Sequence, residues 1–283
     1  MKESIKVKVE QPQYLTDTGV VFGQVPSWCG HTVENLKMDI VFPMEKEKKY
    51  PCIVWICGGA WKEMSTSAHL AYLSRLAMEG FVVASVQYRT SNQVIFPAQL
   101  EDIKAAVRYL RAHSEQYSIQ EDAFGVMGES AGAHLAAMTA LTGDRKEWDK
   151  GWYMDESSAV QAACTWYLPS DMEKMIERTA DYMKAAAPES LLIGGNASVD
   201  REKAAMASPV SYVSPAAPPF LMFHGTEDRT VPFSQSQAMY EKLEAAGAQV
   251  SLVAIEGADH ADVHFFQKEI WDRIICFFQD KLK

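Results

Sequence analysis

The chain has 283 residues, of which 48% are hydrophobic, and its formal net charge is −10 at pH 7. A negative balance of this size repels phosphate backbones and anionic lipids, so it argues against nucleic-acid and membrane partners. The five cysteines are scattered, without Cys-x-x-Cys or paired His/Cys spacing, which predicts reduced thiols in the core and neither a metal nor a cofactor. The start of the chain has no apolar stretch of the signal-peptide kind, so a cytoplasmic location is expected.

Two segments near the start alternate apolar with polar residues. Residues 5–9 and 36–42 both have this pattern, which is typical of strands with one face in water. A strand of this kind favours an antiparallel sheet. We therefore expect both segments to form an antiparallel edge.

From residue 52 onward, short continuous apolar runs replace the alternation, and helical patterns separate them. Such runs are typical of strands that are covered on both faces. They lie at 52–57, 81–86, 124–127, 160–167, 220–223 and 250–255, and a last helix carries Ile270, Ile274 and Phe278. Strands that alternate with helices predict a mostly parallel sheet with helices on both faces. We expect a single α/β domain over residues 1–283.

Residues 171–217 interrupt this rhythm. They contain a short charged helical run, a Gly-Gly-Asn turn and a proline-rich exit. The segment is interpreted as a small cap-like insertion that covers the site. An ordinary surface excursion fits the same pattern equally well.

The five residues Gly128-Glu129-Ser130-Ala131-Gly132 stand between an apolar strand and a helical run. This is the sequence form of a nucleophile elbow, in which a strained strand-to-helix turn exposes a serine hydroxyl to a base. The two glycines leave room for the turn. Ser130 is thus the candidate nucleophile, and Glu129 is interpreted as a turn residue rather than as a second acid.

A base and an orienting acid follow at later strand ends. Asp228 comes just after the run at 220–223, and His260 just after the run at 250–255. Open α/β sheets carry their sites at the carboxyl ends of the strands, so both side chains are expected near Ser130. Glu227 is the nearest rival to Asp228. Two other histidines are interpreted as packing or supporting residues, His134 and His224, and His264 is expected in or near the final helix.

An oxyanion needs backbone N–H donors, and two places in the chain offer them. One is Ala131, whose amide follows the nucleophile. The other is the loop Cys57-Gly58-Gly59-Ala60-Trp61 after the first central run, where the Gly-Gly pair permits amides to turn into a cavity.

Together these motifs resemble the α/β-hydrolases of the lipase/esterase group that have a His-Gly-Gly-type oxyanion loop. Within that group the closest resemblance is to the bacterial feruloyl and acetyl esterases, a branch of carbohydrate esterases. The matching segments are 58–61, 87–89, 96–98, 128–135, 208–209, 218–220, 224–232 and 257–260.

The resemblance implies an α/β-hydrolase fold and a Ser-His-Asp triad of Ser130, His260 and Asp228. It also implies oxyanion donors, which are the amides of Gly59, Ala60 and Ala131. One position departs from the pattern. The family usually begins the oxyanion motif with a histidine that braces the loop, whereas this chain has Cys57, a weak hydrogen-bonding residue.

The substrate is less well defined by the sequence. Trp61, Trp166 and Tyr167 follow predicted strand ends and are candidates to contact a sugar ring or an acyl group. We expect a small-molecule or oligosaccharide ester with a short acyl group, chiefly acetate. An amidase, arylformamidase or peptidase on the same fold is the alternative activity, and a non-catalytic binding protein is the alternative class. The oligomeric state is left open.

Overall fold

The computed structural model describes residues 2–283, and within them eight strands form one sheet. Its order is β1-β2-β4-β3-β5-β6-β7-β8. β1, β2 and β4 pair antiparallel, and every other neighbouring pair is parallel. The predicted α/β fold with antiparallel N-terminal strands is confirmed. The strands are β1 (Tyr14–Ser27), β2 (Thr32–Pro43), β3 (Tyr50–Ile56), β4 (Val82–Val86), β5 (Ile119–Glu129), β6 (Ala162–Trp166), β7 (Phe220–Gly225) and β8 (Val250–Ile255).

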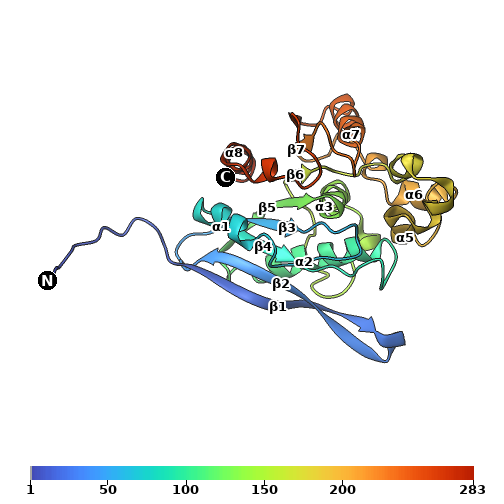
Figure 1. Ribbon diagram of the computed structural model, residues 1–283. Coiled ribbons are helices and arrows are strands. Elements are labelled where there is room, and N and C mark those ends of the chain that lie inside the picture. Colours follow the sequence, from blue (N-terminus) through green and yellow to red (C-terminus); the bar gives the residue numbers. More distant parts are fainter. Residues whose placement is uncertain (1) are drawn as a thin grey trace.

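The strand predicted at residues 5–9 is wrong. Residues 2–13 form no strand, and Ile5, Val7 and Val9 are at least 70% exposed. The edge of β2 is already taken by β1, which pairs with it from Tyr14 opposite Pro43 to Ser27 opposite Thr32. The earlier segment therefore has no strand edge to join, and Figure 1 shows it extending away from the sheet.

The longer helices cover the two faces of the sheet (Figure 1). α2 and α3 pack in one hydrophobic cluster together with part of α7, and α1 and α8 contribute to the other. The predicted C-terminal helix is confirmed as α8, with Ile270, Ile274 and Phe278 buried. The longer helices are α1 (Leu70–Met78), α2 (Ala98–Ala112), α3 (Ala131–Leu141), α7 (Phe233–Ala245) and α8 (Lys268–Leu282).

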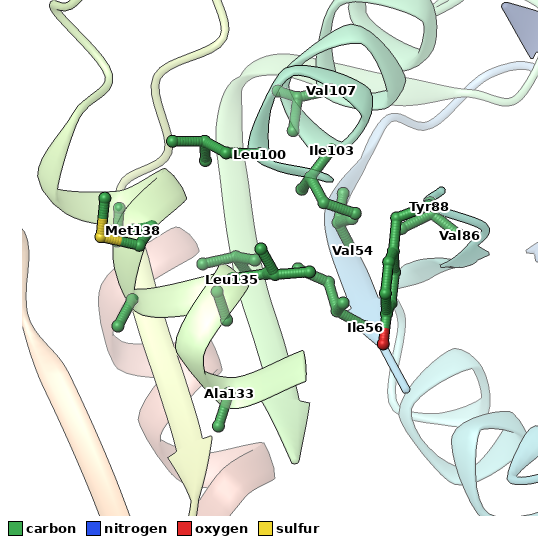
Figure 2. Close-up of a cluster of buried hydrophobic side chains, with 14 of the residues drawn as sticks. Val54, Ile56, Val86, Tyr88, Leu100, Ile103, Val107, Ala133, Leu135 and Met138 are labelled. Atoms are coloured by element: carbon green, nitrogen blue, oxygen red, sulfur yellow. The ribbon is translucent and has the colours of Figure 1, made fainter. Parts of the chain in front are cut away.

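The central strands have continuous apolar sequences because both of their faces are buried, as β3 shows. Val54 and Ile56 belong to the cluster under α2 and α3, whereas Ile53 and Trp55 point into the opposite cluster. Figure 2 shows Leu100 and Ile103 of α2 and Leu135 of α3 gathered against Val54 and Ile56. Because both faces are buried, a polar residue at any of these positions would lose its hydration.

The segment that was predicted as an insertion folds into short helices between β6 and β7. Figure 1 shows it, in yellow and orange, gathered to one side of the sheet. Its last short helix contacts both α3 and α7. The helices are α4 (Met172–Met175), η3 (Ile176–Arg178), η4 (Asp181–Ala186), α5 (Pro188–Ile193), α6 (Arg201–Met206) and η5 (Pro209–Ser211), and the remaining short ones elsewhere in the chain are η1 (Trp28–Gly30), η2 (Lys146–Trp148) and η6 (Val263–Phe266).

None of the helices in residues 2–283 combines the length and apolarity that crossing a bilayer requires. All five cysteines lie in these residues and are free thiols. Cys52, Cys57 and Cys164 are buried, whereas Cys29 and Cys276 are exposed, so the predicted core position is wrong for these two.

Candidate active site

Ser130 occupies a strained turn between β5 and α3. Its backbone has φ 51° and ψ −121°, an unusual conformation for a residue with a side chain. The turn is tight because a Cβ on Gly128 would lie 2.4 Å from the carbonyl oxygen of Gly132, and one on Gly132 would lie 2.0 Å from that of Ile56. The strand-to-helix geometry of a nucleophile elbow is therefore present, and only glycine fits on either side of it.

The structure brings Ser130, His260 and Asp228 together from three separate strand ends. His260 Nε2 lies 3.1 Å from Ser130 Oγ, and His260 Nδ1 lies 2.8 Å from Asp228 Oδ2. Both distances are within hydrogen-bond range. An Nδ1–H that donates to Asp228 leaves the Nε2 lone pair free to accept the proton of the Ser130 hydroxyl.

Asp228 is held as a carboxylate. Its Oδ1 accepts from the amides of Thr230 at 2.9 Å and Val231 at 2.7 Å. Burial alone would raise the pKa of Asp228, but hydrogen bonds from His224 and His260 and the charge of His260 lower that pKa well below its usual range. The acid is therefore charged at neutral pH and can stabilise an imidazolium at position 260.

Within residues 2–283, none of the rival residues forms a hydrogen bond with the Ser130 hydroxyl. Glu227 is exposed, and its amide donates to the carbonyl of Ala258. His224 is buried behind Asp228, with Nδ1 2.7 Å from Ser236 Oγ and Nε2 2.9 Å from the carbonyl oxygen of Val231. His264 is exposed and pairs with Asp262.

The candidate oxyanion donors lie on both sides of Ser130. Gly59 has φ +124° and Ala60 has φ 54°, so the loop after β3 adopts a conformation that is uncommon for residues other than glycine. Ala131 is the first residue of α3, where helix amides have no intrahelical acceptor. Over residues 2–283, no hydrogen bond starts from the amides of Gly59, Ala60 or Ala131. Backbone amides without an internal acceptor can bind an anion.

A cavity of about 340 Å³ opens beside Ser130. Its walls come from the candidate oxyanion loop (residues 57–61), the loop after β7 and the segment between β6 and β7. The lining residues are Ala60, Trp61, Ser130, Pro169, Met175, Arg178, Thr179, Pro188, Glu189, Arg229, Thr230, Val231 and Pro232.

Of the three aromatic candidates for substrate contact, only Trp61 lines this cavity. Its indole Nε1 donates to Nδ1 of His134 at 3.1 Å, and His134 Nε2 lies 2.6 Å from the carbonyl oxygen of Ala207. Burial lowers the pKa of His134 to about 4, which keeps the ring neutral. His134 is thus a packing residue, and it fixes the orientation of the Trp61 ring.

Trp166 and Tyr167 do not contact the cavity, and the prediction that they bind substrate is corrected. Both are 0% exposed. Trp166 ends β6 on the face that packs against Trp55 and Trp271. Tyr167 packs its ring against His260, with the centroids 4.4 Å apart. Both therefore belong to the core beneath the site.

Sequence reasoning missed the surroundings of Glu129. Its side chain is buried, and one carboxylate oxygen lies 3.0 Å from His69 Nε2, 3.7 Å from Cys57 Sγ and 3.4 Å from the amide of Gly58. The other oxygen accepts from the hydroxyl of Tyr167. His69 stands in no motif and is 60 residues from Glu129 in the chain, so no spacing signal would have linked the two.

Cys57, His69 and Glu129 are also the residues in this group whose side chains could serve as ligands of a cation. The potential ligand atoms of Cys57, His69 and Glu129 all lie within 4.8 Å of one another. Each of these atoms already takes part in a hydrogen bond within the group. Burial raises the pKa of the Cys57 thiol to about 11, and a protonated thiol is a poor metal ligand.

Comparisons with known proteins identify a family of esterases. A model of the BD-FAE family matches residues 38–243. Esterase LipQ of Mycobacterium tuberculosis is 33% identical over 220 residues, which cover 76% of this chain and 51% of that protein. A probable isoprenylcysteine alpha-carbonyl methylesterase of Arabidopsis thaliana, ICMEL1, is 24% identical over 250 residues, or 86% of this chain and 52% of that protein. The chain thus spans about half the length of these curated relatives.

Among solved structures, a truncated form of a carbohydrate esterase from gut microbiota superposes with a TM-score of 0.84 and 29% identity. The match covers 96% of this chain and 99% of that one. The thermophilic esterase Est2 of Thermogutta terrifontis, in its propionate-bound form, has a TM-score of 0.73 and 24% identity, with 94% and 92% covered, and so supports the fold alone.

Proposed function

This chain belongs to the BD-FAE family of α/β-hydrolase esterases, and on that premise we propose that it is a serine carboxylic ester hydrolase. The observation that carries the proposal is the hydrogen-bonded chain from Ser130 through His260 to Asp228, next to an open cavity. A nucleophile, a base and an orienting acid in this order are the requirement for acyl transfer through serine.

In the proposed reaction, Ser130 Oγ attacks the acyl carbon while its proton moves to His260 Nε2. The negative charge develops on the former carbonyl oxygen, which the amides of Gly59, Ala60 and Ala131 would stabilise. Collapse of this intermediate breaks the ester C–O bond, and His260 returns the proton to the departing alcohol. Water then attacks the acyl-serine with His260 again as base, which releases the carboxylic acid and restores Ser130.

The proposed substrates are short-chain esters, chiefly acetyl esters, of carbohydrate-derived or other small alcohols. Support comes from the small cavity with polar residues such as Thr179, Glu189 and Arg229, and from the carbohydrate esterase among the structural relatives. Trp61 is the aromatic residue proposed to contact the substrate. We also propose that residues 171–217 act as a cap, because Met175 and Pro188 line the cavity. The single-domain organisation and the cytoplasmic location stay predictions.

A substrate panel tests this proposal. We expect p-nitrophenyl acetate to be hydrolysed with a higher kcat/KM than the decanoate, and acetylated xylo-oligosaccharides to release acetate, both with EDTA present throughout. The cavity of about 340 Å³ is at the lower end of the range for ligand pockets, so a short acyl chain is expected to fit better than a long one. N-formylkynurenine and aminoacyl amides are the comparison substrates. A higher kcat/KM for either of these than for every ester would replace the esterase proposal with an amidase.

The dependence of the rate on pH tests the base. Protonating His260 removes the lone pair that accepts the Ser130 proton, so kcat/KM for p-nitrophenyl acetate should fall as the pH is lowered from 8 to 5. The pKa of Asp228 is held far below this interval, so this carboxylate stays charged throughout. A profile that is flat between pH 5 and 8 would rule out His260 as the base.

A further inference from the structure

We propose that Glu129, together with His69, is the positioning unit that holds the oxyanion loop in place, where Cys57 leaves the usual histidine brace missing. The inference rests on the proposed esterase function and adds a residue role to it. Glu129 does not touch the reacting atoms in this account, and it acts through the backbone of the loop that carries the candidate oxyanion donors.

The first support is direct contact between Glu129 and the loop. Its Oε1 lies 3.4 Å from the amide of Gly58 and 3.7 Å from Cys57 Sγ. The side-chain stem and the backbone of Glu129 are also close to the loop, because a Cβ on Gly58 would lie 3.3 Å from Glu129 Cγ and 3.0 Å from the backbone carbonyl oxygen of Glu129. The loop that contains Gly59 and Ala60 therefore starts on the surface of Glu129, next to Ser130.

The second support is the fixed position of the carboxylate itself. His69 Nε2 lies 3.0 Å from Oε1, and the Tyr167 hydroxyl donates to Oε2. Burial alone would raise the pKa of Glu129, but the hydrogen bonds from His69 and Tyr167 and the charge of His69 lower that pKa. A buried carboxylate that is ionised and bonded on both oxygens is a rigid support for a backbone amide.

The third support is that the two partners of Glu129, Tyr167 and His69, also pack against His260 and the segment that follows it. The Tyr167 ring lies 4.4 Å from the ring of His260, centroid to centroid, while its hydroxyl bonds to Glu129. The His69 ring packs on Phe266, at 5.3 Å, in the segment that follows His260. Glu129 thus sits between the oxyanion loop and the general base, so its loss should displace both relative to Ser130.

The test compares Glu129→Gln, His69→Gln and the double variant with wild type, per active site titrated with paraoxon. Glutamine keeps the shape but replaces one of the two carboxylate oxygens by an NH2 group, which cannot accept the hydrogen bonds made to that oxygen. We expect kcat/KM for p-nitrophenyl acetate to fall about 10- to 100-fold in Glu129→Gln, since a misplacement of about 1 Å can cost this much. The double variant should lose no more than Glu129→Gln, because the two residues act as one unit.

The readout that separates positioning from general structure is the inhibition constant of a trifluoromethyl ketone, whose adduct places an oxyanion in the hole. It should rise by the same factor as kcat/KM falls. Glu227→Gln, an exposed neighbour of the site, is the matched control and should leave both quantities unchanged.

A Glu129→Gln enzyme with wild-type kcat/KM and inhibition constant would overturn the proposal, and so would a loss of kcat/KM with an unchanged inhibition constant. If Glu129→Gln does not fold, His69→Gln decides alone, and wild-type values in that variant overturn it. These outcomes differ from failure of the esterase proposal, in which wild type itself would hydrolyse no ester faster than Ser130→Ala does.

Discussion

We expect the Ser130→Ala variant to hydrolyse p-nitrophenyl acetate at least about 10⁴-fold more slowly than wild type, measured as kcat on purified protein. The hydroxyl oxygen is the atom that forms the bond to the acyl carbon in the proposed reaction. Within residues 2–283, no other group forms a hydrogen bond with His260 Nε2. Among residues 2–283 the Ser130 hydroxyl bonds only to His260. The melting temperature should therefore change little, which separates loss of chemistry from loss of fold.

The control for Ser130→Ala is its own unfolding curve together with the rate of wild type from the same preparation. A variant that is folded and retains the wild-type rate would remove Ser130 as nucleophile. An inactive variant with a strongly lowered melting temperature would mean that the loss of rate reports unfolding, and rates would then be compared well below that temperature.

The second large effect is expected for Asp228→Asn, with kcat lowered about 10⁴-fold. Asp228 Oδ1 accepts two backbone amides, from Thr230 and Val231, so the oxygen of an asparagine would stay there and its NH2 group would face His260. Nδ1 of His260 must then accept, which places the ring proton on Nε2 and blocks transfer from Ser130. The loss of rate is therefore expected from the wrong tautomer of His260, and not from a longer distance between His260 and Ser130.

Stability should also fall in Asp228→Asn near pH 7. The pKa of Asp228 in the folded protein is depressed, so the carboxylate contributes stability above its unfolded pKa and loses it as the pH falls toward the folded value. Glu227→Gln is the matched control because Glu227 is adjacent and exposed. If Glu227→Gln were inactive while Asp228→Asn kept the wild-type rate, the rival acid would be the correct one.

Much of the fold is readable from the sequence because the central strands are buried on both sides. β3 is buried at every position, and such a strand has no polar face to confuse with a loop. The segment at 5–9 has an equally clear alternation and forms no strand. An alternating pattern indicates that a segment could form an edge strand. The free edge of β2 is occupied by β1, however, and the sequence pattern does not show which of the two segments pairs there. The family resemblance was confirmed by the match over residues 38–243.

The sequence likewise identified some residues of the candidate site and missed or misassigned others. Ser130, Asp228 and His260 were found because each follows a strand whose end is fixed by the sheet, and they lie within hydrogen-bond range in the structure. Trp166 was misassigned because a strand end alternates its faces, and its side chain turns into the core beside Trp55. The role of Glu129 was missed and it was interpreted as a turn residue. Its partner His69 lies in a loop before α1, and only the packing of that loop brings the two side chains together.

Identification of the residue that becomes covalently modified tests the central claim most directly. Paraoxon transfers its diethylphosphoryl group to an activated serine and releases p-nitrophenolate, so intact-mass and peptide mass spectrometry report both the number and the position of adducts. The account predicts one adduct per chain, on Ser130, and none in Ser130→Ala. An adduct on another residue, or equal labelling of wild type and Ser130→Ala, would contradict it.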